Sequence, residues 1–172
     1  KKKFSDELIY KKNLPSNSSC KSLYAVTEKI RYEALGGKML KGIKKNFEEN
    51  YSQMINFKRK DQIKSKEDVT INEAFELYML KNFHNIELND LCSKILSFWE
   101  KDFDQSISKH IKFLKENLEN QNIYSSRFSE ILQEMEIFQT EDEDQASDEN
   151  QENNQNNPPD NNDENQEQNE KE

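Results

Sequence analysis

The spacing of apolar residues between Leu23 and Tyr51 constrains the fold of this chain more than any other feature. In its first half, apolar side chains recur at the spacing that places them on one face of a helix: Leu23, Val26, Ile30 and Ala34. Gly36 and Gly37 interrupt the pattern, and a second period starts at Leu40. Because glycine relieves the left-handed conformation with which many helices end, we predict that the first helix ends at the double glycine. A second helix then runs to about residue 59.

Polar side chains that can cap a helix precede several of the other apolar periods. Thr70 and Glu73 have the spacing of a capping box, in which hydroxyl and carboxylate each accept a hydrogen bond from a free backbone N–H. Such caps mark where helices begin. The expected cap residues are Ser18 or Ser19, Thr70, and Asn89 or Asp90.

These periods predict an all-α domain of six or seven helices over residues 1–139. No stretch alternates with period two for long enough to predict a strand. The domain holds the chain's three glycines and only one proline, far fewer than the turns of a β-sandwich need. Besides the two helices that flank the double glycine, we expect helices over residues 4–12, 70–84, 90–103, 107–118 and 124–135.

Charge divides the chain into two parts. Residues 141–172 hold thirteen acidic residues and one lysine, a net charge of −12, whereas the first 140 residues hold 24 basic and 21 acidic side chains, a net charge of +3. The acidic part is made mostly of Asp, Glu, Asn and Gln, so it cannot bury enough apolar surface to offset its ordering entropy. We therefore predict a disordered acidic linker over residues 140–172.

Several classes of protein find no support in this sequence. It has neither an apolar run that would span a membrane nor a signal peptide, and its two cysteines lack zinc-site spacing, which favours a cytoplasmic protein. It lacks a phosphate-binding loop and any recognised serine-nucleophile motif. The small positive charge of the first 140 residues does not indicate a nucleic-acid partner. His84 and His110 are interpreted as capping or surface residues, so we expect no catalytic, cofactor-binding or metal-binding residue.

A charged cluster beside the double glycine is the candidate partner interface. Glu28, Arg31 and Glu33 belong to the predicted helix, and Glu28 and Arg31, three residues apart, can pair on its exposed side. Lys38 and Lys41 extend the cluster at its edge. These side chains could dock on a partner, or they could form an ordinary solvated helix face. Spacing alone favours the solvated face.

Several short motifs, taken in order, resemble a known family. Residues 24–26 read Tyr-Ala-Val, residues 31–36 read Arg-x-Glu-Ala-Leu-Gly, and a basic segment leads to Gly-Ile at 42–43. Asp-Val-Thr-Ile-Asn-Glu-Ala at 68–74 and Leu-Ser-Phe-Trp at 96–99 follow, before an acidic low-complexity segment. Over residues 3–138 the chain resembles the N-terminal helical region of the CobT-type subunit of aerobic cobaltochelatase.

This resemblance implies a place in an ATP-dependent enzyme complex. In that family the subunit works with an AAA+ ATPase subunit and a large chelatase subunit. The complex uses ATP and Mg²⁺ to insert cobalt into hydrogenobyrinic acid a,c-diamide during cobalamin biosynthesis, a ligase reaction that forms nitrogen–metal bonds. The family's metal-ion-dependent adhesion motif lies in a C-terminal domain beyond the acidic linker. The resemblance therefore implies that this region acts in assembly, on the ATPase or on sister subunits.

The alternative is a helical scaffold or adaptor domain with an acidic arm and no link to chelation. Because the chain begins without methionine, we expect it to be a fragment of a longer protein. A parent chain with a D-x-S-x-S motif after the linker would favour the chelatase. A parent that ends near residue 172 would favour the adaptor.

Overall fold

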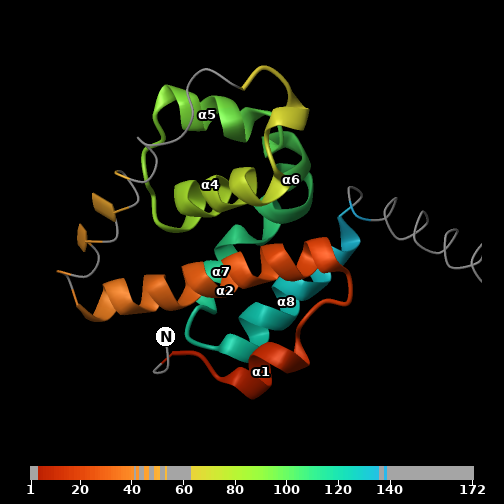
Figure 1. Cartoon of the computed structure of the whole chain (residues 1–172). Coiled ribbons are helices and arrows are strands. Elements are labelled where there is room, and N and C mark those ends of the chain that lie inside the picture. Colours follow the sequence, from red (N-terminus) through yellow and green to blue (C-terminus); the bar gives the residue numbers. More distant parts are fainter. Residues whose placement is uncertain are drawn as a thin grey trace, which may run out of the picture.

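The computed structural model describes residues 4–40, 42, 45, 46, 49, 50, 53, 63–135 and 138. Within these residues every regular element is helical, so the all-α prediction is confirmed. They form seven α-helices and two short 3-10 helices (Figure 1): α1 Glu7–Lys12, α2 Ser18–Met39, η1 Lys66–Asp68, α4 Ile71–Phe83, α5 Asp90–Ser97, α6 Glu100–Ile107, η2 Ser108–His110, α7 Ile111–Glu116 and α8 Gln121–Glu134.

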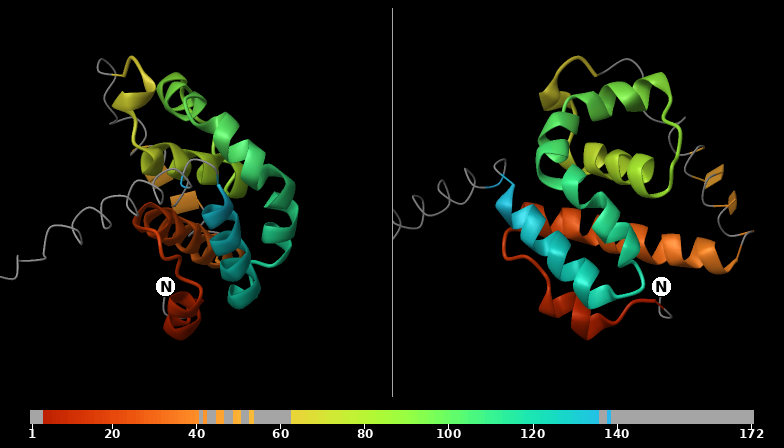
Figure 2. Two further views of the ribbon diagram at one scale, coloured as in Figure 1. Left: turned by 90° about the vertical axis from the view of Figure 1, so that its right-hand side faces the viewer. Right: turned by 180° about the vertical axis from the view of Figure 1, so that it is seen from behind.

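Helix α2 runs through the middle of the fold (Figure 1). Helix α4 packs on one side of it and α8 on the other, while α5 and α6 contact α4 and α1 contacts α8. In Figure 2, α4 and α5 lie above α2, α1 lies below it and α8 lies beside it, and α6 contacts α8 directly. A helix covered on two sides must bury residues around much of its circumference. On α2 these include polar as well as apolar side chains.

Aromatic rings fill the core on both sides of α2. Phe103 of α6 lies against Tyr78 of α4 with ring centroids 5.3 Å apart. Tyr124 and Phe128 of α8 are 5.0 Å apart, and both contact Phe83 at the end of α4. The rings are tilted or edge-on, the arrangements that aromatic quadrupoles favour. The apolar packing therefore joins the two halves of the domain through α4.

Helix α2 does not end at the double glycine, contrary to the prediction. It continues through Gly36 and Gly37 to Met39, and the amide of Leu40 still donates to the carbonyl of Gly36 at 3.1 Å. Neither glycine has a positive φ. Glycine permits a left-handed cap without requiring one, and its cost of about 1 kcal/mol inside a helix is small beside the burial along α2. The second predicted helix, from Leu40 onward, lies mostly outside the described residues.

Most of the predicted caps are present. The side chain of Thr70 caps α4 and that of Asn89 caps α5, as predicted. The prediction for α2 is wrong by one or two residues, because its cap is Asn17 rather than Ser18 or Ser19. The Oδ1 atom of Asn17 accepts from the amide of Ser19 at 2.8 Å. Asparagine and serine are about equally good caps, so local sequence does not separate these positions.

The single helix predicted over residues 90–103 is two helices. Helix α5 ends at Ser97 and α6 begins at Glu100. Between them, the indole N–H of Trp99 donates to the carbonyl of Val69 at 3.3 Å. Because the indole is held against the segment that precedes α4, the chain turns at Trp99 and does not extend α5.

We expect a protein shortened to residues 1–138 to unfold cooperatively. Phe138 is 3% exposed and packs in the same core as the helices. Residues 139–172, which contain the predicted acidic linker, lie outside the described residues. The shortened protein should melt within about 5 °C of the full chain, a difference of roughly 1 kcal/mol for a domain of this size. Calorimetry would test this, and a broad transition without a heat-absorption peak would contradict it.

Candidate functional site

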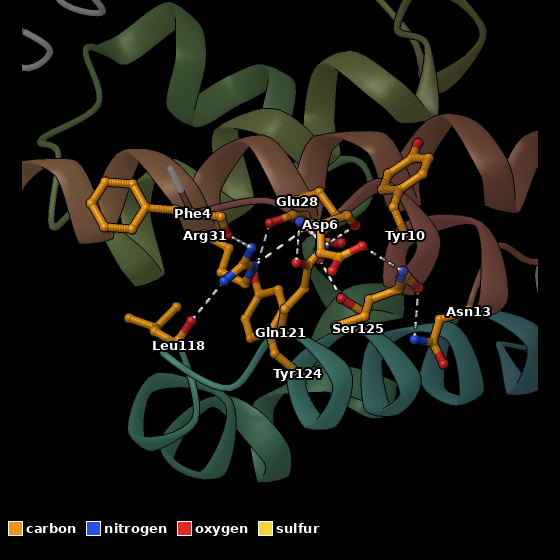
Figure 3. A network of polar contacts seen from close by, with 12 residues as sticks. Phe4, Asp6, Tyr10, Asn13, Glu28, Arg31, Leu118, Gln121, Tyr124 and Ser125 are labelled. Carbon is orange, nitrogen blue, oxygen red and sulfur yellow. Dashed lines mark hydrogen bonds and ion pairs between the residues drawn. The ribbon is translucent and has the colours of Figure 1, made fainter. Parts of the chain in front are cut away.

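Two residues of the predicted partner interface, Glu28 and Arg31, are buried. They are 3% and 1% exposed and lie between α2, α8 and the N-terminal segment (Figure 3). Their predicted pairing is present, but the prediction that they occupy an exposed face is wrong. A three-residue spacing shows which side chains can pair, whereas the partners of a helix decide which side is covered. Burial of both charges is possible here because each finds several polar partners.

Every nitrogen of the Arg31 guanidinium donates a hydrogen bond. Nε donates to Oε2 of Glu28 at 3.3 Å, Nη1 to the carbonyl of Leu118 at 2.9 Å, and Nη2 to the carbonyl of Phe4. Leu118 lies in the connection between α7 and α8, and Phe4 precedes α1. Arg31 therefore links two distant segments of the chain to α2 through one planar group.

The carboxylate of Glu28 binds α8 as well as Arg31. It accepts from Nε2 of Gln121 at 3.2 Å and from the hydroxyl of Ser125. Gln121 in turn holds the backbone of Asp6: Oε1 accepts from the Asp6 amide at 2.7 Å and Nε2 donates to the Asp6 carbonyl at 3.1 Å. We call Glu28, Arg31, Gln121 and Ser125 the buried polar network, which reaches α1 through the backbone of the exposed Asp6. It joins α1, α2 and α8, so its direct role is to hold these helices together.

Replacing Arg31 alone should destabilise the domain strongly. An Arg31→Met variant leaves the Glu28 carboxylate buried without its cation, and breaking a buried pair in this way costs about 3–5 kcal/mol. Glu28→Gln together with Arg31→Met should cost less than the sum of the two single changes. Arg127→Met is the control, because the side chains of Arg127 and its partner Glu130 are 39% and 56% exposed and surface pairs of this kind contribute about 1 kcal/mol or less.

Urea unfolding monitored by circular dichroism measures these changes. Equal losses for Arg31→Met and Arg127→Met would contradict a structural role for the buried pair. A charge-reversing substitution at Arg31 would destabilise the fold, because the side chain is buried. Loss of partner binding in such a variant would therefore not show that Arg31 contacts the partner.

Three buried tyrosines act as hydrogen-bond donors in the core. Burial raises the pKa of Tyr24 to about 12, and its hydroxyl donates to the carbonyl of Tyr10 at 3.1 Å. Burial, and then the nearby charge of Glu28, raise the pKa of Tyr124, whose hydroxyl donates to a backbone carbonyl of α2. Burial raises the pKa of Tyr78 as well, with a further contribution from its hydrogen bond to Asp104.

These pKa shifts predict that alkaline pH destabilises the fold. In the unfolded chain the tyrosines ionise near pH 10, whereas the folded chain keeps Tyr24 neutral until about pH 12. The contribution of the buried tyrosines to stability should therefore be constant below pH 10 and fall as the pH rises from 10 to 12. Urea unfolding at a series of pH values measures this slope, and a Tyr24→Phe variant should show a shallower one. A flat profile up to pH 12 would contradict the assignment.

Glu33 and Lys38, two other residues of the predicted interface, line a cleft on one side of α2. The cleft has a volume of about 400 Å³ and lies between the C-terminal half of α2, the end of α4 and α7. Its lining residues are Glu33, Ala34, Gly37, Lys38, Phe83, His84, Asn85, Ile86, Lys115 and Leu118. We call this the α2–α4–α7 cleft. Glu33 is only 7% exposed, so it does not belong to an open charged face.

His84 faces Glu33 inside this cleft. Its Nε2 atom lies 3.7 Å from Oε2 of Glu33, and His84 also ends α4, as predicted. The next residue, Asn85, has a φ of 52°, a left-handed conformation that few residues other than glycine and asparagine adopt. This turn allows His84 and Ile86, on either side of it, to line the same cleft. Sequence spacing could not have grouped these residues with Lys115.

The end of α2 is the exposed part of the predicted interface. Lys38, Met39 and Leu40 are consecutive, and all three are exposed, Met39 by 53% and Leu40 by 58%. Lys41 lies outside the described residues. Of the predicted interface residues, Lys38 alone is shown to be accessible to a partner protein.

In the part of the chain that the structure describes, no helix combines the length and the apolar character needed to cross a bilayer. No group of three or more His, Cys, Asp or Glu side chains in that part is arranged to hold a metal ion.

The helices, the buried polar network and the cleft define an all-α domain built on one central helix. The family model described as cobalamin biosynthesis protein CobT matches residues 1–172, the whole chain, and the chain therefore belongs to this family. The resemblance inferred from the sequence motifs is confirmed. Membership implies a part in cobalamin biosynthesis, as a subunit of cobaltochelatase. No curated protein and no solved structure matches the chain.

Proposed function

We propose that this chain belongs to an ATP-dependent cobaltochelatase that inserts cobalt into hydrogenobyrinic acid a,c-diamide, and that it acts in assembly of the complex. The match of the whole chain to the CobT family carries this proposal. Cobalt and the corrin ring are substrates of the complex. ATP and Mg²⁺ would be bound by the AAA+ subunit, since this sequence has no phosphate-binding loop.

The end of α2 is the surface that we propose for docking on the AAA+ subunit. Met39 and Leu40 supply adjacent exposed apolar side chains, and Lys38 supplies a positive charge beside them. Protein interfaces combine an apolar centre with a polar rim in this way. Lys41 follows directly in the sequence and stays part of the proposed surface.

The buried polar network fixes the position of the helix that carries this surface. Glu28 and Arg31 fix α2 against α8 and the N-terminal segment two to three helical turns before Met39. Their contribution to docking is therefore indirect, through the position of the helix. Compared with the interface predicted from sequence, the proposed one keeps Lys38 and Lys41 and adds Met39 and Leu40. It leaves out the buried Glu28, Arg31 and Glu33.

Replacing Met39 and Leu40 with serine should weaken binding to the AAA+ subunit by about ten-fold or more. Burial of a large apolar side chain contributes about 1.5–3 kcal/mol, and each 1.4 kcal/mol is a factor of ten in affinity. Leu8→Ser is the matched control, because Leu8 is 78% exposed and belongs to α1 rather than to α2. Size-exclusion co-elution and calorimetric titration with ADP and with ATP measure the effect.

The results of these binding measurements distinguish the AAA+ subunit from the other partners implied by the family. Failure of the unaltered protein to bind the AAA+ subunit with either nucleotide would overturn the docking proposal. Co-elution with the large chelatase subunit, or self-association of this chain, would then assign the contact to one of those partners. Binding that survives the Met39 and Leu40 changes would move the interface to another surface of the domain.

A further inference from the structure

The α2–α4–α7 cleft has the properties of a small-molecule site, and it adjoins the docking surface, with which it shares Lys38. Its volume of about 400 Å³ falls in the range of roughly 300–1,000 Å³ that is typical of ligand pockets. Three elements that are distant in sequence build it, and a left-handed turn at Asn85 shapes one wall. Pockets of this kind are lined by apolar side chains with a few polar groups that orient the ligand.

The inner wall of the cleft is apolar. Phe83 is 9% exposed, Ile86 8% and Leu118 6%, so each shows the cleft only a small part of its side chain. Phe83 also packs on Tyr124 and Phe128 from its other side, which fixes the position of its ring. A wall held in this way is already formed before a ligand arrives. It favours a flat apolar group over a flexible polar one.

The charges that line the cleft are mainly positive. Lys38 and Lys115 form no ion pair with any carboxylate among the described residues, and Lys115 is half-buried with Nζ 5.9 Å from the ring centroid of Phe83. Glu33 is the one carboxylate in the lining, and it faces His84. A partly buried ammonium group without a carboxylate partner attracts an anion more strongly than one in bulk water does.

We propose that the α2–α4–α7 cleft binds a small organic anion whose carboxylate contacts Lys38 and Lys115 and whose flat apolar body packs against Phe83, Ile86 and Leu118. The two lysines come from α2 and α7, so one carboxylate between them would bridge two helices. Glu33 opposes the ligand's charge, so its carboxylate limits the affinity of the cleft for an anion. Since binding to the cleft needs no partner subunit, this proposal does not depend on the proposed docking surface.

The full chain can be titrated with 2-naphthoate, a flat apolar carboxylate, while amide shifts are followed by NMR. We expect saturable shifts confined to the ends of α2 and α4 and to α7, with an affinity about ten-fold or more above that of the neutral 2-naphthamide. Acetate, which has the carboxylate without the apolar body, should also bind about ten-fold or more weakly. Equal affinity for the acid and the amide would overturn the role of the lysines.

Charge variants on one helix provide the matched control. Lys115→Glu should weaken 2-naphthoate binding by about ten-fold or more, whereas Lys112→Glu, an equal charge change at an exposed position of α7 outside the cleft, should not. Glu33→Gln should tighten binding, because it removes the negative charge from the lining. Equal weakening by the two lysine variants would show a general effect of net charge, and it would overturn the proposed site, as would the absence of saturable shifts at millimolar ligand.

Discussion

The buried ion pair between Glu28 and Arg31 is the interaction on which the arrangement of the helices depends. Two charges taken out of water are tolerated only when every donor and acceptor around them is satisfied. Here this requires the Phe4 and Leu118 carbonyls to reach Arg31, and Gln121 and Ser125 to reach Glu28. The pair therefore selects one relative placement of α1, α2 and α8. Apolar contacts alone would allow several such placements, because they have no fixed direction.

The other side of α2 is organised by a different kind of contact. Helices α4 and α6 pack through aromatic rings such as Tyr78 and Phe103, and the turn at Trp99 sets the direction of α6. The contact of α2 with α8 thus combines the buried polar network with apolar packing, whereas the described contacts among α4, α5 and α6 are mainly apolar and aromatic. The α2–α4–α7 cleft opens where α2 extends beyond these packed regions, beside the proposed docking surface at its end.

Local chemistry predicted the helices better than it predicted their limits. Thr70 and Asn89 cap the helices that they were expected to cap, because a cap is decided by a few neighbouring atoms. The double glycine was misjudged because glycine permits a helix to end without requiring it, and α2 keeps its backbone hydrogen bonds as far as the Leu40 amide. Trp99 was misjudged because its indole bonds to the Val69 carbonyl, which is distant in sequence. For the site, spacing identified the Glu28–Arg31 pair but not its burial. Lys115 could not be found at all, since no periodicity relates it to Lys38.

The buried polar network also bears on how the chain folds while it is being made. Arg31 and Leu118 are 87 residues apart, Glu28 and Ser125 are 97 apart, and Asp6 and Gln121 are 115 apart. As the chain leaves the ribosome, α2 emerges long before α8. The side chains of Glu28 and Arg31 therefore stay hydrated until the later helices have been synthesised. The network can close only after Ser125 has emerged. The contacts of the central helix are therefore completed only when α8 is available, although α4 can pack on it earlier.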